Sequence, residues 1–204
     1  MAQYFDNIDL KSELRKINVK IFDLVLTFNS DNGVFCKDKL DYGTRLLLEN
    51  IDWNNINGTL LDVGCGYGPI GIIANKMTGV DVTMCDVNKR ALHLANMNCK
   101  DNHIDAKIIE SNCYENIVGE FDNIITNPPI RAGKKIVYEI LFRAKEHLKD
   151  NGCLYLVIHK DQGAKSLLKD LEKEYQTEVL EKEKGFFVIK CKKCWLVDKN
   201  MLII

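Results

Sequence analysis

Short apolar runs alternate with longer amphipathic segments over most of the chain. Each run ends at a glycine or a polar residue, which is typical of buried strands, and the runs cover residues 60–63, 80–85, 106–109, 121–126 and 154–158. The segments between them have helical length and spacing: one begins at Ile70, one follows the capping residue Asn88, and two cover residues 134–148 and 164–175. Strands that alternate with helices indicate a parallel sheet with helices on both faces.

The first fifty residues also carry structural signals. Residues 20–28 are rich in β-branched and aromatic side chains and are predicted to form a strand, and residues 29–33 form a dense turn signal. A β-hairpin or extended arm is therefore expected here. Residues 41–51 present a broad apolar face (Leu46, Leu47, Leu48 and Ile51), which predicts a helix that packs on the core.

Near the C-terminus, two further strands are predicted at residues 177–181 and 186–191, separated by a turn at Lys184 and Gly185. A connection this short permits only an antiparallel pair. The apolar residues 195–204 are expected to pack on the sheet edge. The predicted fold is α/β: a Rossmann-like, doubly wound sheet that is mostly parallel, with an antiparallel C-terminal hairpin strand.

Composition fits a single folded domain. The chain has 204 residues, 46% of them hydrophobic and 28% charged, which allows one well-buried core. We divide the expected domain into an N-terminal arm and helix (1–50), a catalytic core (51–192) and a tail (193–204). No apolar run is long enough to cross a bilayer, and residues 1–10 lack a signal pattern, so a cytoplasmic location and no membrane partner are expected.

The eight cysteines and the net charge of −1 bear on two classes of site: metal or disulfide sites, and surfaces for nucleic acid. Cytosolic thiols are normally reduced, and the pair Cys191 and Cys194 has no second pair at zinc-site spacing, so structural thiols and no metal are expected. The near-neutral charge means that any surface for nucleic acid must be local.

A glycine-rich turn follows the first of these strands. Glycines let a ligand approach the backbone, and free N–H groups at a helix start favour electron-rich ligand atoms. Gly66, Gly68 and Gly71 match the dinucleotide fingerprint, with Asp86 at the position of the ribose-binding acid. Read from Asp62 instead, the same turn suits a positively charged nucleoside without a pyrophosphate. The turn alone leaves both interpretations open.

A second motif, Asn127-Pro128-Pro129, follows the strand at 121–126. Ligands of open α/β sheets sit beyond the carboxyl ends of the strands, so this loop should face the glycine turn across one cleft. Prolines fix the backbone and contribute carbonyl acceptors without donors. The Asn127 side-chain oxygen and the Pro128 carbonyl can each accept one hydrogen from a planar –NH₂ group. An amine beside an electrophile favours the charged-nucleoside interpretation.

Together, these motifs resemble the class I S-adenosylmethionine-dependent methyltransferases, through residues 61–68 (Leu-Asp-Val-Gly-Cys-Gly-Tyr-Gly) and 127–130 (Asn-Pro-Pro-Ile). Residues 33–44 (Gly-Val-Phe-Cys-Lys-Asp-Lys-Leu-Asp-Tyr-Gly-Thr) and 160–167 (Lys-Asp-Gln-Gly-Ala-Lys-Ser-Leu) resemble, more narrowly, the methyltransferase small domain family, which includes the ribosomal RNA small-subunit methyltransferase C type in its longer, duplicated form. The resemblance covers residues 31–192 and implies a seven-stranded sheet with a reversed last hairpin. This chain resembles the short, single-domain form.

The resemblance implies a role for each motif. Catalytic positions would be Asn127, Pro128 and Pro129. S-Adenosylmethionine would be bound by Asp62, Gly64, Cys65, Gly66, Gly68, Asp86, Val87, Ser111, Asn112 and Asn127. In this scheme Asp62 holds the ammonium group directly or through water, Asp86 the ribose hydroxyls, and Ser111 and Asn112 the adenine edge.

Two positions depart from the family pattern. Ile130 stands where many amino-methyltransferases have an aromatic residue that stacks on the target base, and Asn112 stands where an acid is common. Phe35 and Tyr42 are the candidates for replacing the stacking contact. The remaining expected substrate contacts are Ile130 itself, Arg131 and Lys134, the last two on phosphates.

The expected activity is methylation of a nucleobase amine in structured RNA, with guanine N2 of 16S-type ribosomal RNA as the leading target. In this reaction the amine attacks the sulfonium methyl group in line, so the protein contributes mainly positioning. Three alternatives stay open: methylation of a protein glutamine amide or an adenine amine, a non-catalytic module that binds cofactor or RNA, and a nicotinamide dehydrogenase.

Overall fold

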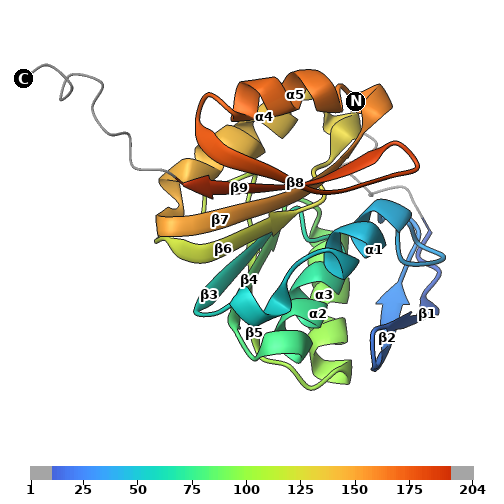
Figure 1. The fold of residues 1–204 in the computed structure, drawn as a ribbon. Helices are drawn as coiled ribbons and strands as arrows, with labels where there is room; N and C mark the ends of the chain where they lie inside the picture. The colour runs from blue at the N-terminus through green and yellow to red at the C-terminus, as the bar shows by residue number, and fades with distance from the viewer. Residues whose placement is uncertain (1–10, 194–204) are drawn as a thin grey trace, which may run out of the picture.

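The structure, a computed structural model, describes residues 11–193 and is built around a seven-stranded sheet (Figure 1). The strand order is β5-β4-β3-β6-β7-β9-β8. Strand β9 runs antiparallel to both of its neighbours, and the other neighbouring pairs are parallel. This confirms the predicted fold class and the antiparallel C-terminal pair. The strands are β3 (Thr59–Val63), β4 (Asp81–Asp86), β5 (Ala106–Glu110), β6 (Phe121–Thr126), β7 (Leu148–His159), β8 (Tyr175–Glu183) and β9 (Phe186–Lys193).

Helices cover both faces of this sheet, as the alternating pattern predicts (Figure 1). One face carries α1 (Tyr42–Glu49), α2 (Pro69–Thr78) and α3 (Lys89–Asp101), and the opposite face carries α4 (Lys134–Arg143) and α5 (Ala164–Leu171). Side chains alternate between these two cores along each strand: Leu60 belongs to the first cluster and Leu61 to the second. Short 3₁₀ turns complete the order at Trp53–Asn55, Ile130–Ala132, Ala144–Glu146 and Lys160–Gln162.

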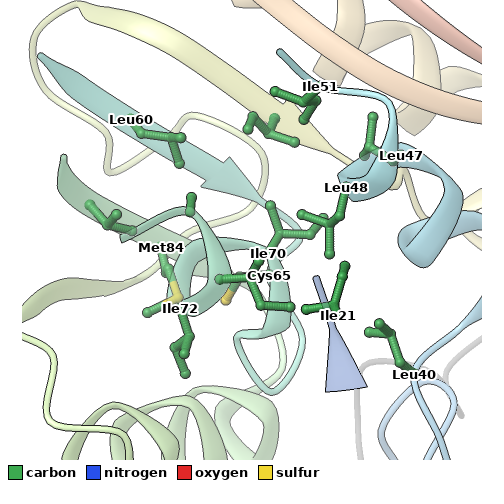
Figure 2. Packing of buried hydrophobic residues seen from close by; sticks show 14 of the residues in the cluster. Ile21, Leu40, Leu47, Leu48, Ile51, Leu60, Cys65, Ile70, Ile72 and Met84 are labelled. Atoms are coloured by element: carbon green, nitrogen blue, oxygen red, sulfur yellow. The ribbon is translucent and has the colours of Figure 1, made fainter. Parts of the chain in front are cut away.

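A separate hairpin, β1 (Arg15–Ile21) and β2 (Leu24–Ser30), packs beside α3 and α1. Its inward residues join the first core, where Figure 2 shows Ile21, Leu48 and Ile70 gathered from three elements. Burial alternates along β1, with Ile17, Val19 and Ile21 facing inward. The hairpin therefore lies over the same face as α1–α3.

The hairpin turn lies elsewhere than predicted. Ile21 pairs with Leu24, so Phe22 and Asp23 form a two-residue loop inside the predicted strand 20–28, and the turn signal at 29–33 follows β2 instead. Tight hairpin loops need positive φ, and Phe22 adopts φ +50°. Phenylalanine is an unusual residue for such a turn, so the prediction placed the turn at the later Asn/Gly cluster.

Two boundaries also differ. Helix α4 ends at Arg143, short of the predicted Leu148, and β7 already begins at Leu148. Pairing between β6 and β7 shifts register before Cys153, and Gly152 lies in this irregular stretch. A Cβ on Gly152 would lie 2.9 Å from the Lys149 carbonyl oxygen, so this glycine fits a crowded bulge and does not end a helix. At the other boundary, α5 ends at Leu171, before the predicted 175, and β8 begins at Tyr175, two residues early.

The expected packing of residues 195–204 concerns a segment outside the described residues. Among the helices that the structure describes, none is both long and apolar enough to span a membrane.

Candidate functional site

A cavity of about 300 Å³ opens beyond the carboxyl ends of β3, β4, β5 and β6. Because these four strands are parallel, the loops that follow them meet at one edge of the sheet. The lining comes from the glycine turn after β3, from Asp86 and Val87 after β4, from Ser111 and Asn112 after β5, and from residues 127–131 after β6. Residues 33–36 and Phe186 close the remaining sides.

The glycine turn and the Asn127 loop face each other. Gly64, Gly66 and Gly68 all have positive φ (73°, 57° and 92°), which glycine adopts without strain. A Cβ built on Gly64 would lie 3.8 Å from Pro129 Cδ, and one on Gly66 would have no atom within 4 Å. Gly66 therefore keeps space beside the cavity empty. Gly68 instead caps α2, where an added Cβ would lie 3.3 Å from Met84 Sδ and 3.4 Å from Ala95 Cβ, and it does not line the cavity.

Most backbone donors of this turn are already used, which corrects the expectation of free N–H groups. Gly64 and Cys65 both donate to the Cys85 carbonyl oxygen, at 2.9 and 3.0 Å. Gly66 donates to Asp86 Oδ2 at 2.9 Å, and Gly71 donates to Asp62 Oδ2 at 3.0 Å. A pyrophosphate needs such donors for itself. The geometry therefore favours a ligand without phosphates over a dinucleotide.

Two acidic side chains lie near the glycine turn, at the ends of β3 and β4; Asp86 lines the cavity, whereas Asp62, which was predicted to bind the cofactor, does not. Asp62 is fully buried beneath the turn, its Oδ1 has no hydrogen-bond partner among the described residues, and burial raises its pKa to about 8. Asp86 lines the cavity and accepts from the N–H groups of Gly66 and Asn88, while burial raises its pKa. Buried carboxyls in this state are stabilised as anions by a nearby cation. The region thus fits the ammonium and sulfonium charges of S-adenosylmethionine.

The loops after β4 and β5 form the neighbouring wall. Val87, Ser111 and Asn112 all line the cavity. The Ser111 hydroxyl donates to the Cys113 carbonyl oxygen and accepts from the Asn116 N–H, so it shapes the loop. Asn112 is exposed, and its Nδ2 donates to Glu115 at 2.9 Å. Its carboxamide oxygen faces no stronger donor than the Cys113 thiol, at 4.0 Å, and remains an acceptor for an adenine amine.

Thiols line the same cavity without reactive character. Cys65, Cys85 and Cys113 all contribute to its wall, and burial raises the pKa of each thiol, that of Cys113 to about 11. Protonated thiols are poor nucleophiles. These cysteines therefore act as small apolar wall residues.

Asn127 is held by helix α1. Its Nδ2 donates to Asp41 Oδ2 at 3.0 Å and to Thr44 Oγ1 at 2.9 Å. Thr126 ties the end of β6 to β3 by donating its hydroxyl to the Val63 carbonyl oxygen at 2.7 Å. Pro128 is buried and Pro129 half-buried, and both line the cavity. The loop thus presents Asn127 from a fixed position.

An apolar wall adjoins Asn127 on the outer side. Phe35, Ile130 and Phe186 line the cavity, and Phe35 is exposed at its rim. A Cβ on Gly43 would lie 3.0 Å from Phe186 Cε1 and 3.1 Å from Asp41 Oδ2, which places the Phe186 ring next to the residues that hold Asn127. Flat apolar surfaces of this kind suit a planar ring.

Of the remaining predicted substrate residues, one lines the cavity and two do not. Arg131 is exposed and lines the cavity. Tyr42 lies behind the wall, with its ring centroid 5.5 Å from that of Phe186. Lys134 does not line the cavity either, and its Nζ lies 4.7 Å above the Tyr138 ring. The lining residues that were not predicted as site residues include four that bear on the chemistry: Asp41, Thr44, Gln162 and Phe186.

The missed residues differ in the signal that could have found them. Asp41 and Thr44 belong to the stretch 33–44 that was already singled out, and Gln162 to the stretch 160–167. Phe186 begins β9, whose antiparallel pairing with β7 brings it to the cavity. No local motif marks it.

Comparisons with known proteins agree with this geometry. The family model described as "Methyltransferase small domain" matches residues 25–190. The protein named "Uncharacterized protein YbxB" from Bacillus subtilis (strain 168) is 42% identical over 195 residues, which cover 93% of this chain and 97% of that relative.

Ribosomal RNA small subunit methyltransferase C of Haemophilus influenzae (strain PittEE) is 38% identical over 156 residues, which cover 74% of this chain and 47% of the relative. This chain therefore spans about half the length of that curated relative. A solved structure, the 16S rRNA N2 G1207 methyltransferase of T. thermophilus in complex with AdoMet and guanosine, superposes with a TM-score of 0.81 at 24% identity, covering 91% of this chain and 52% of that one. This structural likeness shows the fold.

Proposed function

The chain belongs to the methyltransferase small domain family, and from this premise we propose that it methylates an exocyclic amine of a nucleobase in RNA, with guanine N2 of 16S-type ribosomal RNA as the first target to test. Family membership makes it an S-adenosylmethionine-dependent methyltransferase. The proposal concerns the acceptor, and it includes a cytoplasmic site of action, where ribosomal RNA is found.

The acceptor pair at residues 127 and 128 carries the proposal. With Nδ2 of Asn127 bound by Asp41 and Thr44, its amide oxygen is the group that remains for a substrate. The Pro128 carbonyl oxygen beside it is a second acceptor, because proline cannot donate. Two acceptors on one rigid loop suit the two hydrogens of an –NH₂ group, opposite the glycine turn.

The cofactor supplies an activated methyl group that a neutral amine attacks directly. The chain's own contribution is to hold the amine, exclude water and orient the nitrogen lone pair. Hydrogen bonds from both amine hydrogens reduce conjugation of that lone pair with the ring. Asp62 and Asp86 would hold the cationic and ribose parts of the cofactor.

A nucleobase is favoured as the acceptor by the wall beside Asn127. Phe35, Ile130 and Phe186 bracket the space with apolar and aromatic surface, which replaces the stacking residue that the family pattern would place at 130. Similar proteins support an RNA substrate: the H. influenzae relative is named as a ribosomal RNA methyltransferase, and the T. thermophilus structure holds guanosine. A glutamine amide needs the same two acceptors but makes less use of the aromatic wall.

Transfer of labelled methyl groups from S-adenosylmethionine to purified ribosomal RNA and to a protein extract tests the proposal. We expect label in RNA, and mass spectrometry of the digested RNA then identifies the nucleotide. Label confined to protein would overturn the RNA substrate. Cofactor binding with no transfer to either pool would favour a binding module.

A pair of variants assigns roles within the site. Asn127→Ala removes one amine acceptor and should lower kcat by about 100-fold while the cofactor Kd stays within about twofold. Asp86→Ala should raise the cofactor Kd by about tenfold or more, because it removes a charged acceptor. Asn54→Ala, exposed and outside the cavity, is the control. Equal loss of cofactor affinity in both site variants would contradict this division.

A further inference from the structure

We propose that Asp41, supported by Thr44, positions Asn127 for methyl transfer by fixing which end of its carboxamide faces the substrate. The inference rests on the proposed function, because it concerns the acceptor that an amine substrate would meet. Both residues belong to the stretch 33–44 that resembles the family, but the sequence interpretation assigns no role to either of them.

The side chain of Asn127 ends in a carboxamide. Its oxygen and nitrogen ends are nearly equal in size, so packing alone cannot distinguish them, and hydrogen-bond partners must do so. A substrate amine needs the oxygen end. In the opposite orientation, Asn127 would present two N–H donors to a donor, and catalysis would lose its acceptor.

Asp41 supplies this discrimination because a carboxylate only accepts. Asn127 Nδ2 lies 3.0 Å from Asp41 Oδ2 and 2.9 Å from Thr44 Oγ1, so its two hydrogens both have partners. The Thr44 hydroxyl can itself donate to Asp41 Oδ2, at 3.4 Å, which leaves its lone pairs for Asn127. Turning the carboxamide over would place oxygen against oxygen.

The same contact also acts on charge. A hydrogen bond to an anion polarises the amide and strengthens its oxygen as an acceptor. The amine nitrogen becomes positively charged as it gains the methyl group, and a nearby carboxylate favours that change. The position of the carboxylate is set by its hydrogen bonds, because Asp41 Oδ2 accepts from the Thr44 N–H at 2.9 Å and from Asn127 Nδ2 at 3.0 Å.

A purely structural role for Asp41 is the competing explanation. Asp41 is the N-cap of α1, and its Oδ2 accepts from the Thr44 backbone N–H at 2.9 Å. Asparagine caps helices as well as aspartate does. Asp41→Asn can therefore keep the cap through its one oxygen, but it removes the negative charge next to Asn127 and replaces the second oxygen with a donor that allows the group to turn over.

The first experiment compares kcat, cofactor Kd and thermal unfolding. We expect Asp41→Asn to lower kcat by about tenfold or more, with the cofactor Kd within about twofold and little change in the melting temperature. Thr44→Val should show a smaller loss, and Thr44→Ser should be close to wild type because it keeps the hydroxyl. Asp52→Asn is the matched control, since Asp52 caps the 3₁₀ turn at 53–55 and lies outside the cavity. An unchanged kcat in Asp41→Asn would overturn the proposal.

A double variant separates orientation from capping. Asn127→Asp places two carboxylates face to face and should be nearly inactive. Adding Asp41→Asn restores one donor between them, so the double variant should be about tenfold or more faster than Asn127→Asp alone. A lost cap would instead slow both backgrounds by the same factor, and that result would overturn the proposal.

Nitrogen-15 NMR of the free protein tests the orientation of the Asn127 carboxamide without any substrate. Asp41→Asn should shift the side-chain NH₂ resonances of Asn127, whereas Asp52→Asn should leave them in place. If wild type methylates no RNA but these shifts occur, the proposed acceptor fails and the orientation stands. If RNA is methylated and the resonances do not respond, the positioning role fails.

Discussion

Asp62 combines complete burial with an ionisable group and an unpartnered oxygen. Its pKa is raised to about 8, chiefly by burial; the hydrogen bond from Gly71 opposes this rise, and the charge of Asp86 contributes to it. The folded protein therefore holds a proton on Asp62 over a pH range in which the unfolded chain, with an ordinary pKa near 3.8, has released it. Stability due to this group is fully present below about pH 4 and is lost as the pH rises to about 8.

We therefore predict that Asp62→Asn is more stable than wild type at pH 8.5 and that the difference shrinks as the pH falls to 4. The carboxamide oxygen can still accept from Gly71, so the variant removes chiefly the titration. A difference of about 2 °C or more in melting temperature is expected at the higher pH. Calorimetry of the ligand-free proteins across this range tests it. A difference that does not vary with pH would show that Asp62 is not the titrating group.

Individual site residues were predictable where they belong to a contiguous motif that follows a strand. Gly64, Gly66, Asp86 and Asn127 all line the cavity, because strand ends of a parallel sheet converge. Their chemical roles remain predictions. Phe186 could not be found in this way, because its contribution depends on strand pairing far along the chain.

At the scale of elements, Asn98 of α3 joins the hairpin to the glycine turn. Its Oδ1 accepts from the backbone N–H and Nδ2 of Asn29, at 2.6 and 3.0 Å. Its Nδ2 donates to the carbonyl oxygens of Asn29 and Tyr67, at 3.0 and 2.8 Å. The side chain is fully buried. One carboxamide thus connects β2, α3 and the turn that borders the cavity.

Asn98→Ala should lower the free energy of unfolding by about 2–4 kcal/mol, because several buried polar groups lose their partner. It should also weaken cofactor binding, since Tyr67 belongs to the turn. Urea denaturation and calorimetry with the cofactor measure the two effects. Asn96→Ala is the matched control on the same helix: its side chain is exposed and donates to the Leu92 carbonyl oxygen within α3, so the variant should change stability by less than about 0.5 kcal/mol. Similar losses in both variants would exclude the connecting role.

The central strands of the core sheet followed from the hydrophobic pattern because strands such as β3 and β6 are buried on both faces. The predicted element boundaries were wrong where local backbone geometry, and not the residue type, sets the boundary. Phe22 occupies a positive-φ turn position, and Gly152 lies in an irregular stretch of β7. Phe22 is not a residue type that indicates a turn, and Gly152 in the sequence resembles the glycine that ends a helix.

For the whole molecule, the parallel core of the sheet was predictable because strands alternate with helices along the chain. The short connection at Lys184 and Gly185 predicted the antiparallel last pair, and the resemblance to a family implied seven strands. The order of the strands comes from the structure alone. Function at this scale depends on surface charge, which the fold does not determine. The net charge of −1 provides no general attraction to a polyanion.

RNA affinity should therefore come from few cations near the cavity and should depend weakly on salt. Arg131 is exposed on the cavity wall, and Lys107 is exposed at the opposite edge of the sheet, near the start of β5. We predict that Arg131→Ala weakens binding of ribosomal RNA fragments and reduces the slope of log K against log salt by about 1, and that Lys107→Ala changes neither. Titrations at several salt concentrations measure the affinity and the salt slope, with S-adenosylhomocysteine in place of the methyl donor to prevent turnover. Equal effects of the two variants would mean that RNA is held by charge spread over the surface, away from Asn127.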